Sequence, residues 1–144
     1  LPLALVSSFI LLPYYLPLFD GLGSLYGPMT RAGEFVGAQG AEGSVLSDSP
    51  IPLYYSALPP ERLLGPWSLP EEPGEALLTL DDWGVEYVIA SDLPSRLTDL
   101  FPGLGRGEPV EGFLLVNSSG GWEVGYGGRS AHIYKYRRFG KYGG

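Results

Sequence analysis

The first pattern along the chain is a run of apolar residues at its start. Residues 1–19 contain no acidic or basic side chain, and Asp20 is the first residue that is charged at neutral pH. In a helix, with a rise of about 1.5 Å per residue, such a segment comes close to crossing a hydrocarbon core. Pro13 and Pro17 would kink or end the second half of that helix. We therefore expect an apolar N-terminal helix that leaves a membrane near its carboxyl end.

The side chains of this segment need a partner that covers them. Tyr14 and Tyr15 suit the aromatic belt of a membrane interface. A buried core helix is the alternative to a membrane helix. The chain opens on Leu1 with no basic residue before the apolar run, which favours a fragment or processed product over a cleavable signal peptide. The side chains expected to meet a lipid bilayer or other copies of the chain are Leu5, Phe9, Leu12, Tyr14, Tyr15 and Phe19.

A Gly-rich connector over residues 20–27 leads into a region where helical and extended patterns alternate. Gly37 and Gly40 are expected to end the first helix of this region. Gly84 is expected to cap the third helix in a left-handed conformation, directly before the best strand of the chain. The pattern predicts helices at 28–36, 53–57, 75–83 and 94–101 and strands at 44–47, 62–67 and 85–90.

The remaining pattern is extended. After a Gly-rich loop over 102–109 it predicts strands at 110–116, 121–126 and 131–136, with residues 117–121 as a hairpin connection. The fold class is therefore α/β: a small mixed-sheet sandwich with flanking helices and a C-terminal antiparallel meander. One domain is expected over residues 28–138, followed by a basic, aromatic and Gly-containing tail over 139–144.

Composition and charge narrow the class of protein. The net charge of −7 argues against nucleic acid as a partner. The basic residues near the end of the chain are expected to be solvated, or to meet lipid headgroups or an acidic neighbour. Without cysteine the chain has no disulfide and no thiolate chemistry. The chain contains one Asn, one Gln and one Met. Such depletion of thermolabile side chains is typical of proteins from hyperthermophiles.

Few residues are candidates for chemistry. Asp48, after a predicted strand, could bind a metal or a sugar hydroxyl, or it could form a turn or helix cap. Tyr54 and Tyr55 follow closely and are further ligand candidates. The lone His132 has no nucleophile or acid beside it in the sequence. The sequence therefore predicts no catalytic residue, no metal site and no cofactor.

Asn117 begins an Asn-Ser-Ser sequon. A hairpin position would expose it, and an extracytoplasmic location would make it a usable glycosylation site.

Residues 31–66, RAGEFVGAQGAEGSVLSDSPIPLYYSALPPERLLGP, resemble the region after the last membrane span of glycosyltransferases of the dolichyl-phosphate-mannose protein mannosyltransferase type, in their archaeal form. The stretch from Trp83 to Ile89 and the terminal strand HIYKY extend this similarity over most of the chain. In that family the catalytic acids lie upstream in an early loop, so none of them matches a residue here. The resemblance implies a membrane-attached extracytoplasmic domain.

Two functions follow from these observations. The first is the non-catalytic extracytoplasmic domain of a membrane glycosyltransferase-like protein. The second is a self-assembling structural subunit, a homo-oligomer or filament at the cell surface that buries residues 1–19 between copies. What covers residues 1–19, lipid or protein, distinguishes the two.

Overall fold

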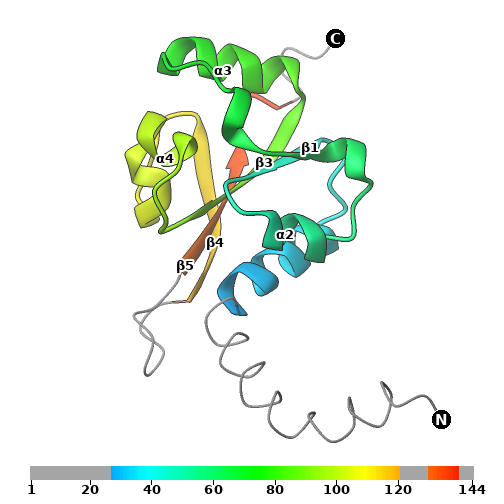
Figure 1. Ribbon diagram of the computed structural model, residues 1–144. Helices are drawn as coiled ribbons and strands as arrows, with labels where there is room; N and C mark the ends of the chain where they lie inside the picture. Colours follow the sequence, from blue (N-terminus) through cyan, green and yellow to red (C-terminus); the bar gives the residue numbers. More distant parts are fainter. Residues whose placement is uncertain (1–26, 121–129, 140–144) are drawn as a thin grey trace, which may run out of the picture.

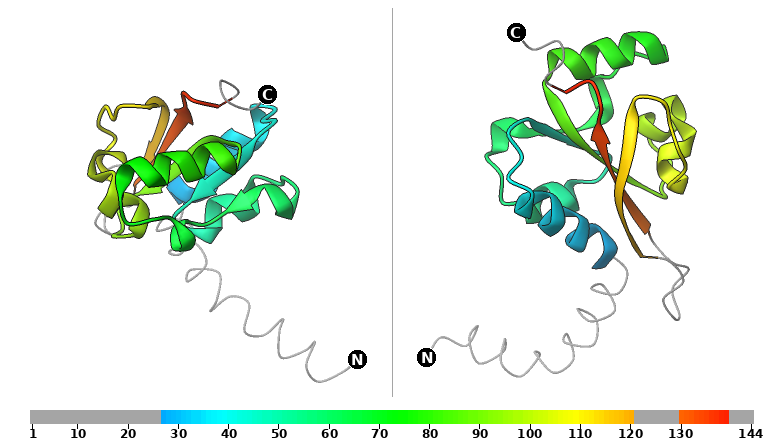
Figure 2. Two further views of the ribbon diagram at one scale, coloured as in Figure 1. Left: turned by 90° about the horizontal axis from the view of Figure 1, so that it is seen from above. Right: turned by 180° about the vertical axis from the view of Figure 1, so that it is seen from behind.

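The computed structural model of the protein describes residues 27–120 and 130–139. In this part of the chain one mixed sheet of five strands has helices on both faces (Figures 1 and 2). This confirms the α/β prediction and the mixed sheet. The predicted apolar helix over 1–19, the strand at 121–126 and most of the tail over 139–144 lie outside the described residues.

The described part opens with a helix over residues 27–38. The elements that follow are β1 (Ser44–Ser47), α2 (Pro50–Tyr55), η1 (Pro60–Arg62), β2 (Leu63–Leu64), η2 (Pro66–Ser68), α3 (Pro73–Asp82), β3 (Val85–Ser91), α4 (Arg96–Leu100), η3 (Pro102–Arg106), β4 (Phe113–Gly120) and β5 (Ser130–Tyr136).

The strand order in the sheet is β2-β1-β3-β5-β4. The first three strands are parallel, while β5 pairs antiparallel with both β3 and β4. Every residue of β3 is buried, as expected for the centre of a sheet that is covered on both faces.

The parallel half is doubly wound. The chain passes from β1 to β2 through α2 on one face, and from β2 back across β1 to β3 through α3 on the other face. Right-handed connections that run in opposite directions along a sheet place their helices on opposite faces. The direction of winding therefore changes between β1 and β3, and the carboxyl ends of these two strands lie side by side.

Two hydrophobic cores fill the two layers. The first lies between the sheet and α3, α4 and η3, and its largest side chains include Leu80, Leu97, Phe113, Tyr134 and Tyr136. The second lies between the sheet and helices 27–38 and α2, and includes Met29, Val36, Val45, Ile89 and Ile133. Strand β5 serves both cores because its side chains alternate between the two faces, as its sequence predicts.

Helix 27–38 continues past the predicted end at residue 36, so the prediction that Gly37 ends it is wrong. A Cβ on Gly33 would lie 2.2 Å from the carbonyl oxygen of Pro52, and one on Gly37 would lie 2.3 Å from that of Ser56. Both glycines let α2 approach the helix backbone directly. Gly37 is thus a packing residue, and the turn comes at Gly40, where φ is +67°.

Proline shortens the second predicted strand. The pattern predicts a strand over 62–67, but only Leu63 and Leu64 pair with β1. Pro60 and Pro66 each begin a short 3-10 helix on either side of these two residues. In contrast, Gly84 adopts the predicted left-handed conformation, with φ of +65°, between α3 and β3.

The pattern misplaces the first strand of the C-terminal region. Strand β4 begins at Phe113, three residues later than predicted, after a turn in which the Phe113 N–H donates to the Val110 carbonyl. Residues 117–120 are part of β4 and pair with β5, so the prediction of a hairpin connection there is wrong. The predicted loop over 102–109 contains the 3-10 helix η3.

Candidate functional site

A polar cluster joins the carboxyl ends of β1 and β3. Both carboxylate oxygens of Asp48 lie 3.1 Å from the Ser91 backbone nitrogen, which donates to them. Oδ2 also accepts from the hydroxyls of Ser91 at 3.2 Å and Ser95 at 3.3 Å. Asp48 thereby ties the end of β1 to the end of β3 and to the residue that caps α4.

Burial raises the pKa of Asp48, and the hydrogen bonds from Ser91 and Ser95 partly oppose that rise. The turn and cap roles that the sequence allowed for Asp48 belong to its neighbours. Ser47 Oγ accepts from the Ser49 N–H, and Ser49 Oγ accepts from the Ile51 N–H at the start of α2. Asp48 is left to bridge the two strands.

This cluster occupies the place where doubly wound sheets bind ligands, outside the carboxyl ends at the change of winding direction. Its groups are one carboxylate and several serine hydroxyls, which can hydrogen-bond to sugar hydroxyls. In the structure they bond to one another, so a ligand would have to exchange for these contacts. The sequence indicated Asp48 but not its partners, Ser91 at the end of β3 and Ser95 at the start of α4, which follow it by more than forty residues.

Tyr54 and Tyr55 lie apart from Asp48. The two rings contact each other edge to face, with centroids 5.2 Å apart, and 79% of Tyr54 is exposed. Because Gly33 meets Pro52 and Gly37 meets Ser56, α2 runs in the same direction as helix 27–38. Its carboxyl end, with both tyrosines, therefore points away from residue 27. No hydrogen bond joins Asp48 to either tyrosine.

His132 has a partner that the sequence did not indicate. Its Nδ1 lies 2.8 Å from Ser118 Oγ on the neighbouring strand. Burial lowers the pKa of His132, and the charge of Asp92 partly opposes this. Within the described residues no carboxylate is hydrogen-bonded to the imidazole, so the third member of a Ser-His-acid arrangement is not in place there.

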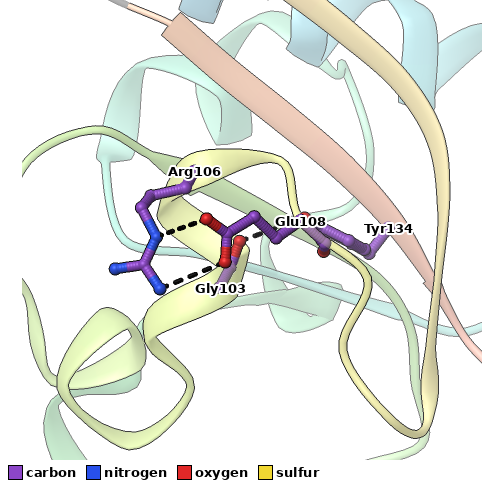
Figure 3. Close-up of polar contacts among 4 residues, drawn as sticks. All are labelled: Gly103, Arg106, Glu108 and Tyr134. Atoms are coloured by element: carbon purple, nitrogen blue, oxygen red, sulfur yellow. Dashed lines mark hydrogen bonds and ion pairs between the residues drawn. The ribbon is translucent and has the colours of Figure 1, made fainter.

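The Gly-rich segment around η3 is held against the sheet by a tyrosine. The Tyr134 hydroxyl donates to the carbonyl of Glu108 at 2.8 Å and to that of Gly103 at 3.4 Å (Figure 3). Burial, with a contribution from Glu108, raises the pKa of Tyr134 to about 12. Arg106 and Glu108 form an exposed ion pair at 2.8 Å. A Cβ on Gly103 would lie 2.8 Å from Val110 Cγ2 and one on Gly105 would lie 2.9 Å from Thr98 Cγ2, so these glycines allow the segment to pack closely.

The adjacent acidic residues at the end of α3 have a structural partner or face solvent. Asp81 accepts from the Tyr136 hydroxyl at 2.8 Å and pairs with Arg138 at 2.6 Å. Asp82 is exposed on α3. An open groove beside α4, which the sequence did not suggest, is lined by Glu71, Arg96, Asp99 and Leu100.

Within residues 27–120 and 130–139 no three acidic or histidine side chains converge as a metal site would require. No helix in the described residues has the length and hydropathy of a membrane span. The predicted membrane or assembly residues Leu5, Phe9, Leu12, Tyr14, Tyr15 and Phe19 lie outside this part of the chain. Asn117 is half-buried on β4 and not in a hairpin turn, so its glycosylation stays a prediction.

Searches with protein-family models, among curated proteins and among solved structures found no match to this chain.

Proposed function

We propose that this chain is a non-catalytic extracytoplasmic domain of a membrane glycosyltransferase-like protein, anchored by residues 1–19. In this proposal the carboxyl edge of its sheet faces the membrane. The single observation that carries it is where helix 27–38 begins. This helix runs in the same direction as α2, because Gly33 meets Pro52 and Gly37 meets Ser56, and α2 starts directly after the carboxyl end of β1. Helix 27–38 therefore begins at the edge that carries Asp48 (Figure 1), and in this proposal the anchor reaches the domain from that edge.

This orientation would set the Asp48, Ser91 and Ser95 cluster near the headgroups of the bilayer. A lipid-linked sugar, the donor class that the resemblance implies, presents its hydroxyls at that depth. Carboxylates and serine hydroxyls suit hydrogen bonds to such hydroxyls. The domain would position this headgroup or the acceptor, while the chemistry is done upstream.

Vesicle flotation of the whole chain tests the anchor. We expect the wild type to float with lipid vesicles and the double variant Leu5→Glu/Leu12→Glu to remain at the bottom of the gradient, because buried charges oppose insertion. Leu78→Glu/Leu93→Glu is the matched control, since both leucines are exposed on the domain. A wild type that stays with protein oligomers in the presence of lipid would favour the structural subunit instead.

Nuclear magnetic resonance tests the ligand class. We expect the amides of Ser91 and Ser95 to shift when the chain, held in bicelles, meets dolichyl-phosphate-mannose, and to shift less with dolichyl phosphate alone. Asp48→Ala should make the shifts with the two lipids equal. Asp92→Ala, at the exposed position that follows Ser91, should leave the shifts with the two lipids different. Equal shifts with both lipids would remove the sugar from the proposal and leave the anchor untouched.

A further inference from the structure

Trp67 is exposed, yet its ring is held in a defined position. The residue lies in η2, and 73% of it is exposed. A Cβ on Gly65 would lie 1.5 Å from Trp67 Cζ3 and 2.1 and 2.2 Å from the two ring atoms beside it. These distances place that position over the face of the six-membered ring. One face of the indole therefore rests on the Gly65 backbone, and the opposite face is open to solvent.

The ring of Trp67 lies at the carboxyl edge of the sheet, beside α4. Segment η2 follows β2, which runs parallel to β1, and η2 contacts α4. Arg96 of α4 donates from Nη1 to the Leu69 carbonyl at 3.2 Å, two residues after Trp67. The four residues from Trp67 to Glu71 span at most about 14 Å. Trp67 is therefore next to the open groove that lies between Glu71 and α4.

The polar side chains of this groove are largely unused by the fold. We call it the α4 groove; it is lined by Glu71, Arg96, Asp99 and Leu100, and its volume of about 420 Å³ is in the range of small-molecule sites. Within the described residues the carboxylates of Glu71 and Asp99 form no hydrogen bond or ion pair, and Arg96 uses one of its five N–H donors for the Leu69 carbonyl. The groove thus offers free acceptors and free donors, unlike the Asp48 cluster, whose groups bond to one another.

We propose that Trp67 and the α4 groove bind a neutral oligosaccharide. One sugar ring stacks on the free face of Trp67, and the next unit places its hydroxyls in the groove. The face of an aromatic ring is negative and attracts the slightly positive C–H groups on one side of a pyranose. A hydroxyl both donates and accepts, so it can bond to the carboxylates of Glu71 and Asp99 and to the guanidinium of Arg96. Because Gly65 already fixes the indole, little side-chain freedom is lost on binding.

The charges around Trp67 favour a neutral sugar over other occupants. The carboxylates of Glu71 and Asp99 oppose insertion into a bilayer and repel anionic headgroups. Arg96 opposes an organic cation, which an indole face alone would attract. One ring and a groove of four residues are also small against the roughly 1,200 Å² that a specific protein interface buries. The proposal does not rest on the proposed function, since it uses no residue of the apolar segment or of the Asp48 cluster.

Nuclear magnetic resonance of the whole chain tests the ligand. The protein is held in micelles of a polyoxyethylene detergent, whose headgroup contains neither sugar nor choline and so does not compete for Trp67. The probes are maltotetraose, cellotetraose and an α-linked mannotetraose, and the indole N–H signal of Trp67 is assigned by its loss in Trp67→Tyr. We expect a saturable shift of this signal with at least one probe. Its dissociation constant should be the same in low and high salt, because the ligand carries no charge.

Gly65→Ala is the sharpest variant, because it retains Trp67 but displaces its ring. The backbone at Gly65, with φ of −109° and ψ of 163°, suits alanine, so the fold should persist. Binding should weaken at least about tenfold in Gly65→Ala and in Trp67→Leu. It should be retained in Tyr54→Leu, the matched control on another exposed ring.

Three results would overturn the proposal. The first is the absence of a saturable shift of the Trp67 signal with all three tetrasaccharides. The second is equal affinity of the wild type and Gly65→Ala. The third is a Trp67 signal that responds to anionic bicelles or to oligolysine and not to any sugar, since a bilayer or a cationic partner would then be the occupant.

Discussion

The two halves of the sheet are built differently. In the parallel half β1 and β3 are buried between two layers of helices, and its edge strand β2 is cut to two residues by flanking prolines. In the antiparallel half β4 is long and its central side chains are exposed. The parallel half thus contains closely packed backbones and the hydrogen bonds of Asp48 that join β1 to β3. The antiparallel half has exposed apolar side chains on its edge strand.

The largest test of this contrast is Gly33→Ala. A methyl group there would lie 2.2 Å from the Pro52 carbonyl oxygen, so two backbones must separate. We expect a loss of about 3 kcal/mol in the free energy of unfolding, at the upper end for overpacking. Gly74→Ala is the control, because its methyl group would meet only the flexible end of Glu72. Equal denaturation midpoints for the two variants would contradict close packing of α2 on helix 27–38.

Asp48→Ala breaks the tie between β1 and β3. It leaves the Ser91 N–H and two hydroxyls without their acceptor, which should cost about 2 kcal/mol at neutral pH. Burial raises the pKa of Asp48 above its ordinary value of 3.8, so its contribution is largest below that value and falls as the pH rises through the raised pKa. Urea denaturation should therefore show a larger cost in acid. A cost that grows from acid to neutral pH would contradict this assignment.

Tyr136→Phe probes the link from β5 to α3. The hydroxyl donates to Asp81 at 2.8 Å and to the Leu77 carbonyl at 3.1 Å, and the ring packs against Phe113. Since the ring stays in place, thermal unfolding should show a loss of about 1 kcal/mol. Tyr54→Phe, on an exposed ring, should leave the stability unchanged. A comparable loss in both variants would argue against the buried hydrogen bonds.

The smallest effect is expected at His132 in the antiparallel half. Burial lowers its pKa below the ordinary 6.5, so stability from the neutral ring is present above that value and is lost as the pH falls through the lowered pKa. The contribution of His132 to stability therefore falls on acidification, whereas that of Asp48 rises. The drop in denaturation midpoint on acidification should be shallower in His132→Gln than in the wild type, and identical slopes would refute this role.

Local pattern was sufficient for the parts of the fold that one segment determines. The buried strand β3, the left-handed Gly84 and the alternation of β5 follow from short runs of residues. It failed where a distant segment decides. Gly37 reads as a helix end until α2 lies on it, and residues 117–120 read as a turn until β5 pairs with them.

The candidate site shows the same limit. Asp48 stands out in the sequence because it follows a strand, but its role depends on Ser91 and Ser95, which reach it only through the parallel pairing of β1 with β3. A local pattern predicts where strands occur. The order of the strands in the sheet decides which carboxyl ends lie side by side, and no local pattern contains that order. The Ser118 and His132 pair likewise exists only through the register of β4 with β5.

The orientation of the domain on a membrane can be measured most directly with two matched labels. Asp92 follows β3 at the carboxyl edge and Asp82 ends α3 at the opposite edge, and both are exposed. A fluorophore on Asp92→Cys or Asp82→Cys of the whole chain, in vesicles whose lipid headgroups carry a quencher, reports which edge faces the bilayer. We predict strong quenching at position 92 and little at position 82. Equal quenching, or stronger quenching at position 82, would contradict the account.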